Sequence, residues 1–326
     1  MSITFLNADA GIDLGSHTSK LACENKFAAN IEGSNLLTIR EEAEIFFDEP
    51  VFSCVIAVPD FFSRRQRDEI IFSAKKSGFK NVEIITAHEA MISAINDNNK
   101  ILVYDFGASK SEVIIFEGNE ILDSEIINDV CGNEFDKVFS EWLSERFTLN
   151  LIDEKILRSR AELIKIALSS NDFITWRDVD ITRDDFERLI FFSIKRVFHT
   201  IERFINCYKP VKFIITGGGS EIPLMKKFLN GLNINIEFNN NLTASGAAIK
   251  AHSANKNQTS ERINTASKFR ELRGELIEIE DLLTRKQKDR LYFLFKQAEG
   301  VLTHDATIIN LLENLIKSIR SEEIKN

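Results

Sequence analysis

The chain has 326 residues, 44% of them hydrophobic and 28% charged, which is typical of a globular protein and excludes fibrous and wholly disordered classes. Lys and Arg number 41 against 50 Asp and Glu, a formal net charge of −9 that disfavours a general nucleic-acid binder. The acidity is concentrated in residues 1–250, because residues 251–326 carry 13 basic and 12 acidic side chains. The length suggests two domains, at roughly 100–200 residues each.

The cysteines and the apolar runs bear on where the protein works. The four cysteines form no CxxC pair and flank no histidine pair, so we expect free thiols in a reducing cytosol and no structural zinc site. No charged-then-apolar leader opens the chain, and no apolar run reaches about 18 residues. We therefore expect a cytoplasmic protein that contacts neither membrane nor nucleic acid.

Strands and amphipathic helices alternate along the first 250 residues, which favours an α/β fold with a mainly parallel sheet. The expected strands are 10–14, 21–23, 55–58, 82–85, 101–105, 112–116 and 213–216. The expected helices are 36–47, 66–77, 89–95, 132–146, 156–168, 183–207 and one from Pro223 to about Asn230. A polar stretch, 253–260, is expected to be a linker, and the tail after it is expected to be helical.

The most informative feature is an internal repeat. Asp13-Leu14-Gly15 and Asp105-Phe106-Gly107 lie 92 residues apart, and each ends an expected strand and opens a hairpin turn. A carboxylate at such a point can hold Mg²⁺ or its waters, and a glycine turn can present backbone N–H groups to phosphate oxygens. Two such hairpins are expected to grip a polyphosphate from both sides.

A third glycine run supports phosphate binding. Gly217-Gly218-Gly219-Ser220 follows an expected strand and precedes a helix, where free backbone N–H groups favour anions. Neither GxxxxGK[ST] nor GxGxxG occurs, which disfavours the P-loop and dinucleotide-binding folds. The histidines outside the first hairpin form no visible constellation in the sequence: His88, His199, His252 and His304.

These motifs resemble those of one known family. Gly11–Gly15 resembles the first phosphate loop of the seventy-kilodalton heat-shock chaperones, which belong to the actin/hexokinase superfamily. Further matches follow in the family's order and together cover about residues 9–252: Val55–Phe62 with Arg65–Arg67, Val103–Gly107, Cys131–Asp136, Thr216–Pro223 and Ala244–Ala248.

The resemblance implies two duplicated actin-like, ribonuclease H-like lobes with reduced upper subdomains. Lobe I would span about residues 1–100 plus the helix 244–252, and lobe II about 101–243. A linker at 253–260 and a helical, lid-like tail at 261–326 would follow, with no β-rich peptide-binding domain. Only about 30 residues separate Lys20 from Val51, so the family's strand and helices that carry its catalytic lysine have no counterpart.

The resemblance also implies roles for single residues. Asp13 and Asp105 would hold Mg²⁺ through water, and Glu89 would position a metal or the attacking water, so these three are the expected catalytic residues. The expected nucleotide contacts are Gly15, Ser16, His17, Gly107, Ala108, Ser109, Lys110, Glu162, Lys165, Gly217, Gly218, Gly219 and Ser220.

Three departures from the family pattern affect this machinery. Lys110 stands where the family has a phosphate-loop threonine, and it could replace lost positive charge or remain a solvated loop residue. Glu221 and Ile166 stand where two arginines sandwich the adenine. Each stacked cation is worth about 0.5–2 kcal/mol, so we expect weaker nucleotide binding.

The expected function is that of a reduced, heat-shock-70-like chaperone protein that binds ATP or ADP with Mg²⁺. Hydrolysis would be weak or absent, and any surviving activity would be a slow Mg²⁺-dependent ATPase. The short lobes also resemble the specialised chaperones of iron–sulfur cluster assembly, which implies a J-domain co-chaperone and an iron–sulfur scaffold protein as partners. The alternative is a degenerate, non-enzymatic interaction module that binds a co-chaperone without nucleotide. A sugar-kinase or filament-forming relative is disfavoured by the Val58–Arg67 segment.

Overall fold

The computed structural model describes residues 8–15, 17–23, 26–47, 50–148, 153–253 and 312–317, with the single tail residues 268, 271, 272, 275, 283, 288 and 291. The chain divides into two compact units, Met1–Ala251 and His252–Asn326. Ser16, nearly all of the expected linker and most of the expected helical tail lie outside the described residues. Within the tail, residues 312–317 are helical.

The first half of the larger unit is built on one five-stranded sheet, in the order β3-β2-β1-β4-β5. Strands β2 and β3 run antiparallel to their neighbours, whereas β4 and β5 run parallel to β1. The elements are β1 (Ala8–Asp13), β2 (Thr18–Cys23), β3 (Lys26–Glu32), α1 (Leu36–Phe47), β4 (Val51–Val58), α2 (Arg64–Lys76), β5 (Asn81–Thr86) and α3 (Ala87–Ile95).

The second half repeats this topology in a second five-stranded sheet, in the order β12-β11-β6-β7-β8. The antiparallel pairs are again β6 with β7 and β7 with β8, and the parallel pairs are β6 with β11 and β11 with β12. The elements are β6 (Lys100–Phe106), β7 (Ser111–Glu117), β8 (Glu120–Ile127), α4 (Gly132–Phe147), α5 (Glu154–Ser170), β9 (Phe173–Trp176), β10 (Val179–Thr182), α6 (Arg183–Tyr208), β11 (Lys212–Thr216), the 3-10 helix η1 (Gly218–Glu221), α7 (Pro223–Leu229) and β12 (Asn235–Phe238).

The matching strand orders confirm the expected duplicated α/β fold. The two halves differ in what is inserted at equivalent places. Between β3 and β4 the first half has only α1, whereas between β8 and β11 the second half has α4, α5, the β9–β10 hairpin and α6. The described part of the first half therefore has no counterpart of the larger insertion in the second half, which agrees with the short stretch of sequence between Lys20 and Val51.

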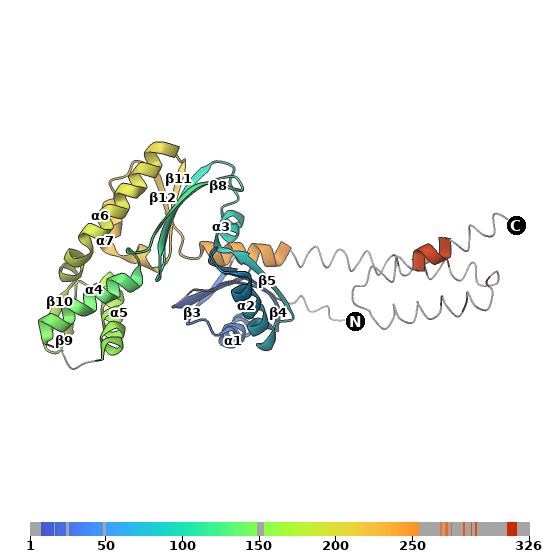
Figure 1. Ribbon diagram of the computed structural model, residues 1–326, viewed down its shortest axis with the longest axis horizontal. Helices are drawn as coiled ribbons and strands as arrows, with labels where there is room; N and C mark the ends of the chain where they lie inside the picture. The colour runs from blue at the N-terminus through green and yellow to red at the C-terminus, as the bar shows by residue number, and fades with distance from the viewer. Residues whose placement is uncertain are drawn as a thin grey trace. The chain divides into compact units, whose positions relative to one another are not determined.

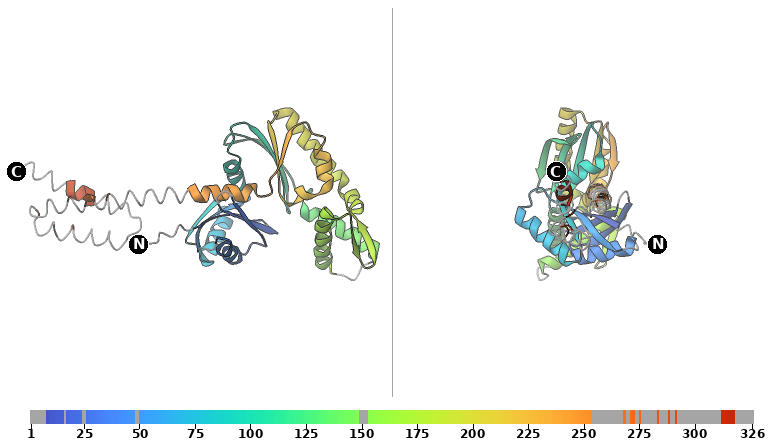
Figure 2. Two further views of the ribbon diagram at one scale, coloured as in Figure 1. Left: turned by 180° about the vertical axis from the view of Figure 1, so that it is seen from behind. Right: turned by 90° about the vertical axis from the view of Figure 1, so that its right-hand side faces the viewer.

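The core is layered, with helices on both faces of each sheet (Figures 1 and 2). Ile39 of α1 packs with the first sheet, and Ile194 of α6 packs with the outer face of the second. Helix α3 lies between the sheets, because Ala90 packs with the first sheet and Met91 with the second. A helix over residues 242–253 shares this middle layer through Ala247.

Glycines allow the middle layer to approach the first sheet closely. A Cβ atom on Gly11 of β1 would lie 2.0 Å from the backbone nitrogen of Ala248, and one on Gly246 would lie 1.7 Å from the carbonyl oxygen of Ala90. Any larger residue would push these backbones apart. The Gly11 contact seats the helix over residues 242–253 against the strand that carries Asp13, and the Gly246 contact brings the same helix close to α3.

Five strands were not predicted from the sequence: β3, β8, β9, β10 and β12. Strand β8 shows why, because Ile121, Leu122 and Ile126 are exposed along it and the period-two alternation of a half-buried strand is lost. Strands β9, β10 and β12 have only four residues each, too few for a periodic signal. Within the described residues, no helix combines the length and apolar character needed to cross a bilayer.

Candidate functional site

The two repeated aspartates meet at the centre of the larger unit. Asp13 ends β1 and lies across from Lys20 of β2, while Asp105 lies near the end of β6. Burial raises the pKa of Asp13 to about 6; the Lys20 ammonium opposes this rise and the Asp105 carboxylate adds to it. The two hairpins thus bring two like charges close enough to repel each other.

Asp105 is surrounded by charges of both signs. Its strand neighbours are Glu112 on β7 and Thr216 on β11. Burial raises its pKa, the Lys20 and Lys110 ammonium groups lower it, and the Glu112 carboxylate raises it again. Lys20 therefore acts on both aspartates at once, although it lies on a strand of the first half only.

The glycine-rich loop packs against the second hairpin. Gly217 has a φ of +86°, and a Cβ atom there would lie 2.4 Å from the carbonyl oxygen of Phe106 and 2.8 Å from Oδ1 of Asp105. Gly219 lies over the Phe106 ring, where a Cβ would be 2.3 Å from Cγ. A Cβ on Gly218 would meet no atom within 4 Å, so this position opens onto free space.

Asn240 ties the glycine loop to Lys20. The Ser220 hydroxyl donates a 2.7 Å hydrogen bond to Oδ1 of Asn240, and the Asn240 side-chain amide donates one of 2.7 Å to Glu221. The Lys20 ammonium donates to the carbonyl oxygen of Asn240. Glu221 also accepts a 2.8 Å hydrogen bond from Lys226, so both oxygens of its carboxylate already have hydrogen-bond donors.

The second hairpin is held by the start of α4. Gly132 donates its N–H to the carbonyl oxygen of Gly107 at 3.1 Å, and Asn133 donates to that of Ala108 at 2.8 Å. The turn is closed by the Gly107 N–H, which donates to the Lys110 carbonyl at 3.0 Å, and Ser109 is exposed at its tip. The first N–H groups of α4 are therefore used to fix the hairpin.

Lys110 is part of a charge network that crosses between the halves. Its ammonium lies 2.7 Å from Oε2 of Glu112, a residue that is only 3% exposed. The other Glu112 oxygen lies 3.3 Å from Nε2 of His88 on α3, and Nδ1 of His88 lies 3.1 Å from Asp60. The expectation that His88 belongs to no constellation is wrong, because its partners lie far from it in sequence and meet it only in the fold.

The network shifts the pKa values of its members. Burial alone would lower the pKa of His88, but hydrogen bonds to Asp60 and Glu112 outweigh it and raise that pKa to about 9. Burial would raise the pKa of Glu112, but hydrogen bonds from His88 and Lys110 lower it overall. His88 is therefore a cation at neutral pH, and Lys110 is neutralised by its own strand neighbour.

The expected adenosine-side residues Glu162 and Lys165 each have an ionisable partner elsewhere in the larger unit. The His17 Nε2 lies 2.8 Å from Oδ1 of Asn133, and its Nδ1 lies 3.9 Å from Oε1 of Glu162 on α5. The Lys165 ammonium lies 2.6 Å from Oδ1 of the buried Asp136. His17 thus joins the first hairpin to α4 and α5, and Lys165 pairs within the second half.

Glu89 is placed by the start of α3. Its carboxylate accepts a 2.7 Å hydrogen bond from the Thr86 N–H, while its own N–H donates to the Thr86 hydroxyl at 3.1 Å. This reciprocal pair is a capping box, which satisfies two otherwise unpaired donors at the helix start. Glu89 is exposed, and in the described part of the chain its side-chain hydrogen bond is local.

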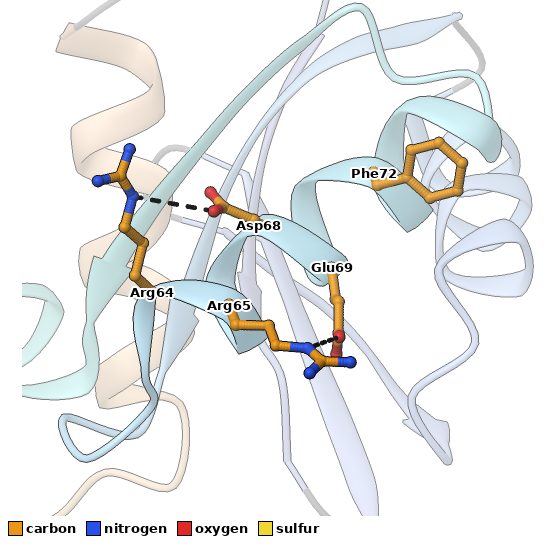
Figure 3. A pocket seen from close by; sticks show the side chains of 5 residues that line it. All are labelled: Arg64, Arg65, Asp68, Glu69 and Phe72. Atoms are coloured by element: carbon orange, nitrogen blue, oxygen red, sulfur yellow. Dashed lines mark hydrogen bonds and ion pairs between the residues drawn. The ribbon is translucent and has the colours of Figure 1, made fainter.

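The surface of α2 holds a different kind of feature. A shallow depression of about 490 Å³ is lined by Arg64, Arg65, Asp68, Glu69 and Phe72 (Figure 3). Arg65 pairs with Glu69 at 2.9 Å and Arg64 with Asp68 at 3.9 Å, so the charges along the helix cancel. Phe72 is 71% exposed. The depression has no net charge and shares none of its residues with the carboxylate hairpins.

Comparison with known proteins identifies the family. The model of the family described as Hsp70 protein matches residues 10–265, which is more than half of the chain. The chain belongs to the Hsp70 family. This confirms the resemblance found in the phosphate-loop motifs, and the Hsp70 match covers both duplicated halves.

Individual Hsp70 relatives are distant and much longer. The chain is 26% identical over 261 residues to chaperone protein dnaK1 of Synechococcus elongatus, an alignment covering 66% of this chain and 40% of the relative. It is 25% identical over 248 residues to a chaperone protein HscA homolog of Rickettsia typhi, covering 69% of this chain and 40% of the relative. The chain thus spans about 40% of the length of these Hsp70 relatives.

Several residues at the Hsp70-type site were missed by sequence reasoning. No role at the site was expected from the sequence for five residues: Lys20, Asp60, His88, Glu112 and Asn240. For Lys20 a signal was available, because strand register across a tight hairpin places it opposite Asp13. Asn240 and His88 reach the site through contacts with residues far from them in sequence, both within and between the halves, which no local pattern reports.

Proposed function

We propose that this chain is a reduced Hsp70-family protein that binds ATP or ADP through the phosphates, with weak or absent hydrolysis. The observation that carries the proposal is the convergence of three loops. The Asp13 hairpin, the Asp105 hairpin and the glycine loop meet around one cluster of carboxylates and Lys20. Such loops suit a polyphosphate because they offer backbone N–H groups and little side-chain bulk.

The residues at this point fit a nucleotide with its metal ion. Asp13 and Asp105 are the residues that would hold Mg²⁺ through water, and the ion would neutralise charge on the phosphates. Within the described residues, no three His, Cys, Asp or Glu side chains are grouped so that they could hold a metal ion by themselves. Water and phosphate oxygens would therefore have to complete the coordination shell.

The adenosine end supports weak binding. Glu162 and Lys165, which would contact the nucleoside, are engaged with His17 and Asp136 in the free protein. Glu221 is held by Lys226 and Asn240. A nucleoside would have to displace these interactions, whereas the open space at Gly218 is available without rearrangement. We therefore expect nucleotide binding to depend mainly on the phosphates, with little contribution from the base.

The same residues support slow turnover. Hydrolysis of ATP requires an attacking water positioned in line and positive charge near the transferred phosphoryl group. The Glu89 carboxylate is occupied in capping α3, and Lys110 is paired with Glu112. Each would have to leave its partner before it could act on a bound nucleotide. We therefore expect nucleotide binding to be easier to detect than hydrolysis.

Titration of the full chain with ATP by calorimetry and thermal shift tests the proposal. At 100 times its Kd, a ligand should stabilise the fold by about 2.7 kcal/mol. Gly218→Val, which fills the open space, should weaken binding while leaving the unliganded melting temperature near its original value. The matched control is Gly231→Val, a glycine outside the site. If millimolar ATP gives neither heat nor a change in melting temperature, the better explanation is the alternative function, a non-enzymatic interaction module that binds no nucleotide.

Family membership supports a chaperone-type role with a J-domain co-chaperone as partner. One of the relatives is described as an HscA homolog, and this motivates iron–sulfur cluster assembly as the finer possibility. We propose both for this chain, with an iron–sulfur scaffold protein as the second partner. Surface plasmon resonance with purified J-domain and scaffold proteins of the same organism would test each pair, and absence of binding with and without ATP would contradict it.

A further inference from the structure

Lys20 occupies an unusual position for a basic residue. It lies on β2 directly across from Asp13, and its ammonium donates to the carbonyl oxygen of Asn240 in the segment that follows β12. The same Asn240 is bound by Ser220 of the glycine loop. One lysine thus connects the first hairpin to the glycine loop, and its charge acts on both Asp13 and Asp105.

Two carboxylates that approach each other in a partly buried site need a compensating cation. A diffusible divalent ion can supply it, but so can an ammonium group that the fold holds in place. Lys20 is fixed at its backbone by the β1–β2 ladder and at its tip by Asn240. These contacts place Lys20 beside the carboxylates without help from a metal ion or a nucleotide.

We propose that the Lys20 ammonium is a built-in cation of the phosphate site, which lets a nucleoside polyphosphate bind with little dependence on divalent metal. This inference rests on the proposed nucleotide binding and specifies its cation requirement. Asp13 and Asp105 can still hold Mg²⁺ through water. Lys20 already offsets part of their charge, however, so the metal adds less to binding than it would beside two uncompensated carboxylates.

The remaining charges around the site agree with this. Four carboxylates face the cluster, Asp13, Asp105, Asp60 and Glu112, and three cations face them, Lys20, Lys110 and His88. Lys110 and His88 are paired to Glu112, and His88 also to Asp60. Among the groups the structure describes, Lys110 and His88 act on Asp105, whereas Lys20 acts on both Asp13 and Asp105. The cluster carries a net charge near −1 before any metal binds.

The direct test is calorimetry of the full chain with ATP in excess Mg²⁺ and, separately, in excess EDTA. We expect the two dissociation constants to agree within about threefold, less than the effect of one close charge pair at a protein surface. Binding in Mg²⁺ but not in EDTA would overturn this inference and leave the proposed nucleotide binding intact. Absence of binding under both conditions would instead overturn the proposed function.

Variants of Lys20 assign the effect to its charge. Lys20→Met keeps the length of the side chain but removes the ammonium, and it should weaken binding in EDTA about tenfold or more while Mg²⁺ restores most of the loss. Lys20→Arg should bind in EDTA like the parent chain. The control is Lys155→Met, an exposed lysine on α5. Equal binding of Lys20→Met and the parent chain in EDTA would contradict the proposal.

A titration with Mn²⁺ alone, followed by electron paramagnetic resonance, gives a readout without nucleotide. Removal of the internal cation should expose the Asp13–Asp105 pair to a competing ion. Lys20→Met should therefore bind Mn²⁺ about tenfold more tightly than the parent chain. Unchanged Mn²⁺ affinity in a folded Lys20→Met protein would show that Lys20 does not compete for this place.

Discussion

Replacing Asp13 with asparagine should stabilise the unliganded protein at neutral pH. The folded pKa of Asp13 is about 6 instead of 3.8, because the half-buried carboxylate loses hydration and lies near Asp105. Ionised Asp13 therefore opposes folding at pH 7, by about 3 kcal/mol for a shift of this size. Asn has nearly the same shape and no charge, so we expect Asp13→Asn to recover about 1–3 kcal/mol, since rearrangement around the new amide offsets part of the gain.

The pH dependence makes this prediction specific. A raised folded pKa means that the folded state binds the proton more tightly than the unfolded state does. The penalty is absent below about pH 4, grows between about pH 4 and 6, and is complete above about pH 6. The stability difference between Asp13→Asn and the parent chain should follow this curve. At about 2–4 °C per kcal/mol for a unit of this size, a gain of about 1–3 kcal/mol raises Tm at pH 7.5 by about 2–12 °C.

Thermal unfolding by circular dichroism across pH 4–8 is the assay. Asp129→Asn is the control, since Asp129 forms a surface pair with Arg196 and should change stability little at any pH. A Tm of Asp13→Asn equal to or below that of the parent at pH 7.5 would refute the claim that ionised Asp13 destabilises the fold. So would a stabilisation of the same size at pH 4 and pH 7.5.

Three further predictions concern the surroundings of the site. Gly217→Ala combines a φ of +86° with a backbone clash, so it should destabilise by about 2 kcal/mol or more in urea unfolding, against about 1 kcal/mol for the open Gly33→Ala. His88→Gln should remove an alkaline transition. Protonated His88 stabilises the fold fully below about pH 6.5, and this stabilisation is lost as pH rises through the folded pKa of about 9. The Tm of the parent chain should therefore fall across pH 7–10, and that of the variant should not. Lys165→Met should cost about 3 kcal/mol because it leaves the Asp136 carboxylate buried without its cation, and Lys165→Met combined with Asp136→Leu should restore most of that in the same assay.

Much of the fold could be predicted because its signals are local. Asp13-Leu14-Gly15 and Asp105-Phe106-Gly107 are strand-end and turn patterns read within a few residues, and two copies of one pattern predict a duplicated fold. The glycine loop ending at Ser220 was likewise visible as a turn before a helix. In each case a short stretch of chain determines the backbone conformation, so composition and spacing were sufficient.

The charge compensation within the site could not be predicted in this way. Lys110 was expected either to replace lost positive charge or to be a solvated loop residue. Its state instead depends on Glu112, which is buried by strand pairing and also bound by His88 from the other half. Partners such as Glu112 and His88 depend on strand register and on packing between the halves. Glu89 differs, because its capping box with Thr86 is a local pattern with a spacing of three residues.

Competitive calorimetry with ATP, inorganic tripolyphosphate and adenosine tests phosphate-led binding most directly. Tripolyphosphate should bind and be displaced by ATP, with an affinity within about tenfold of that of ATP. The reason is that in the proposed complex the loops around Asp13 and Asp105 would contact the phosphates, while the adenosine-side residues are paired internally. Adenosine alone should give no heat at millimolar concentration. Binding of adenosine without binding of tripolyphosphate, or no binding of any of the three ligands, would contradict the assignment of these loops to nucleotide phosphates.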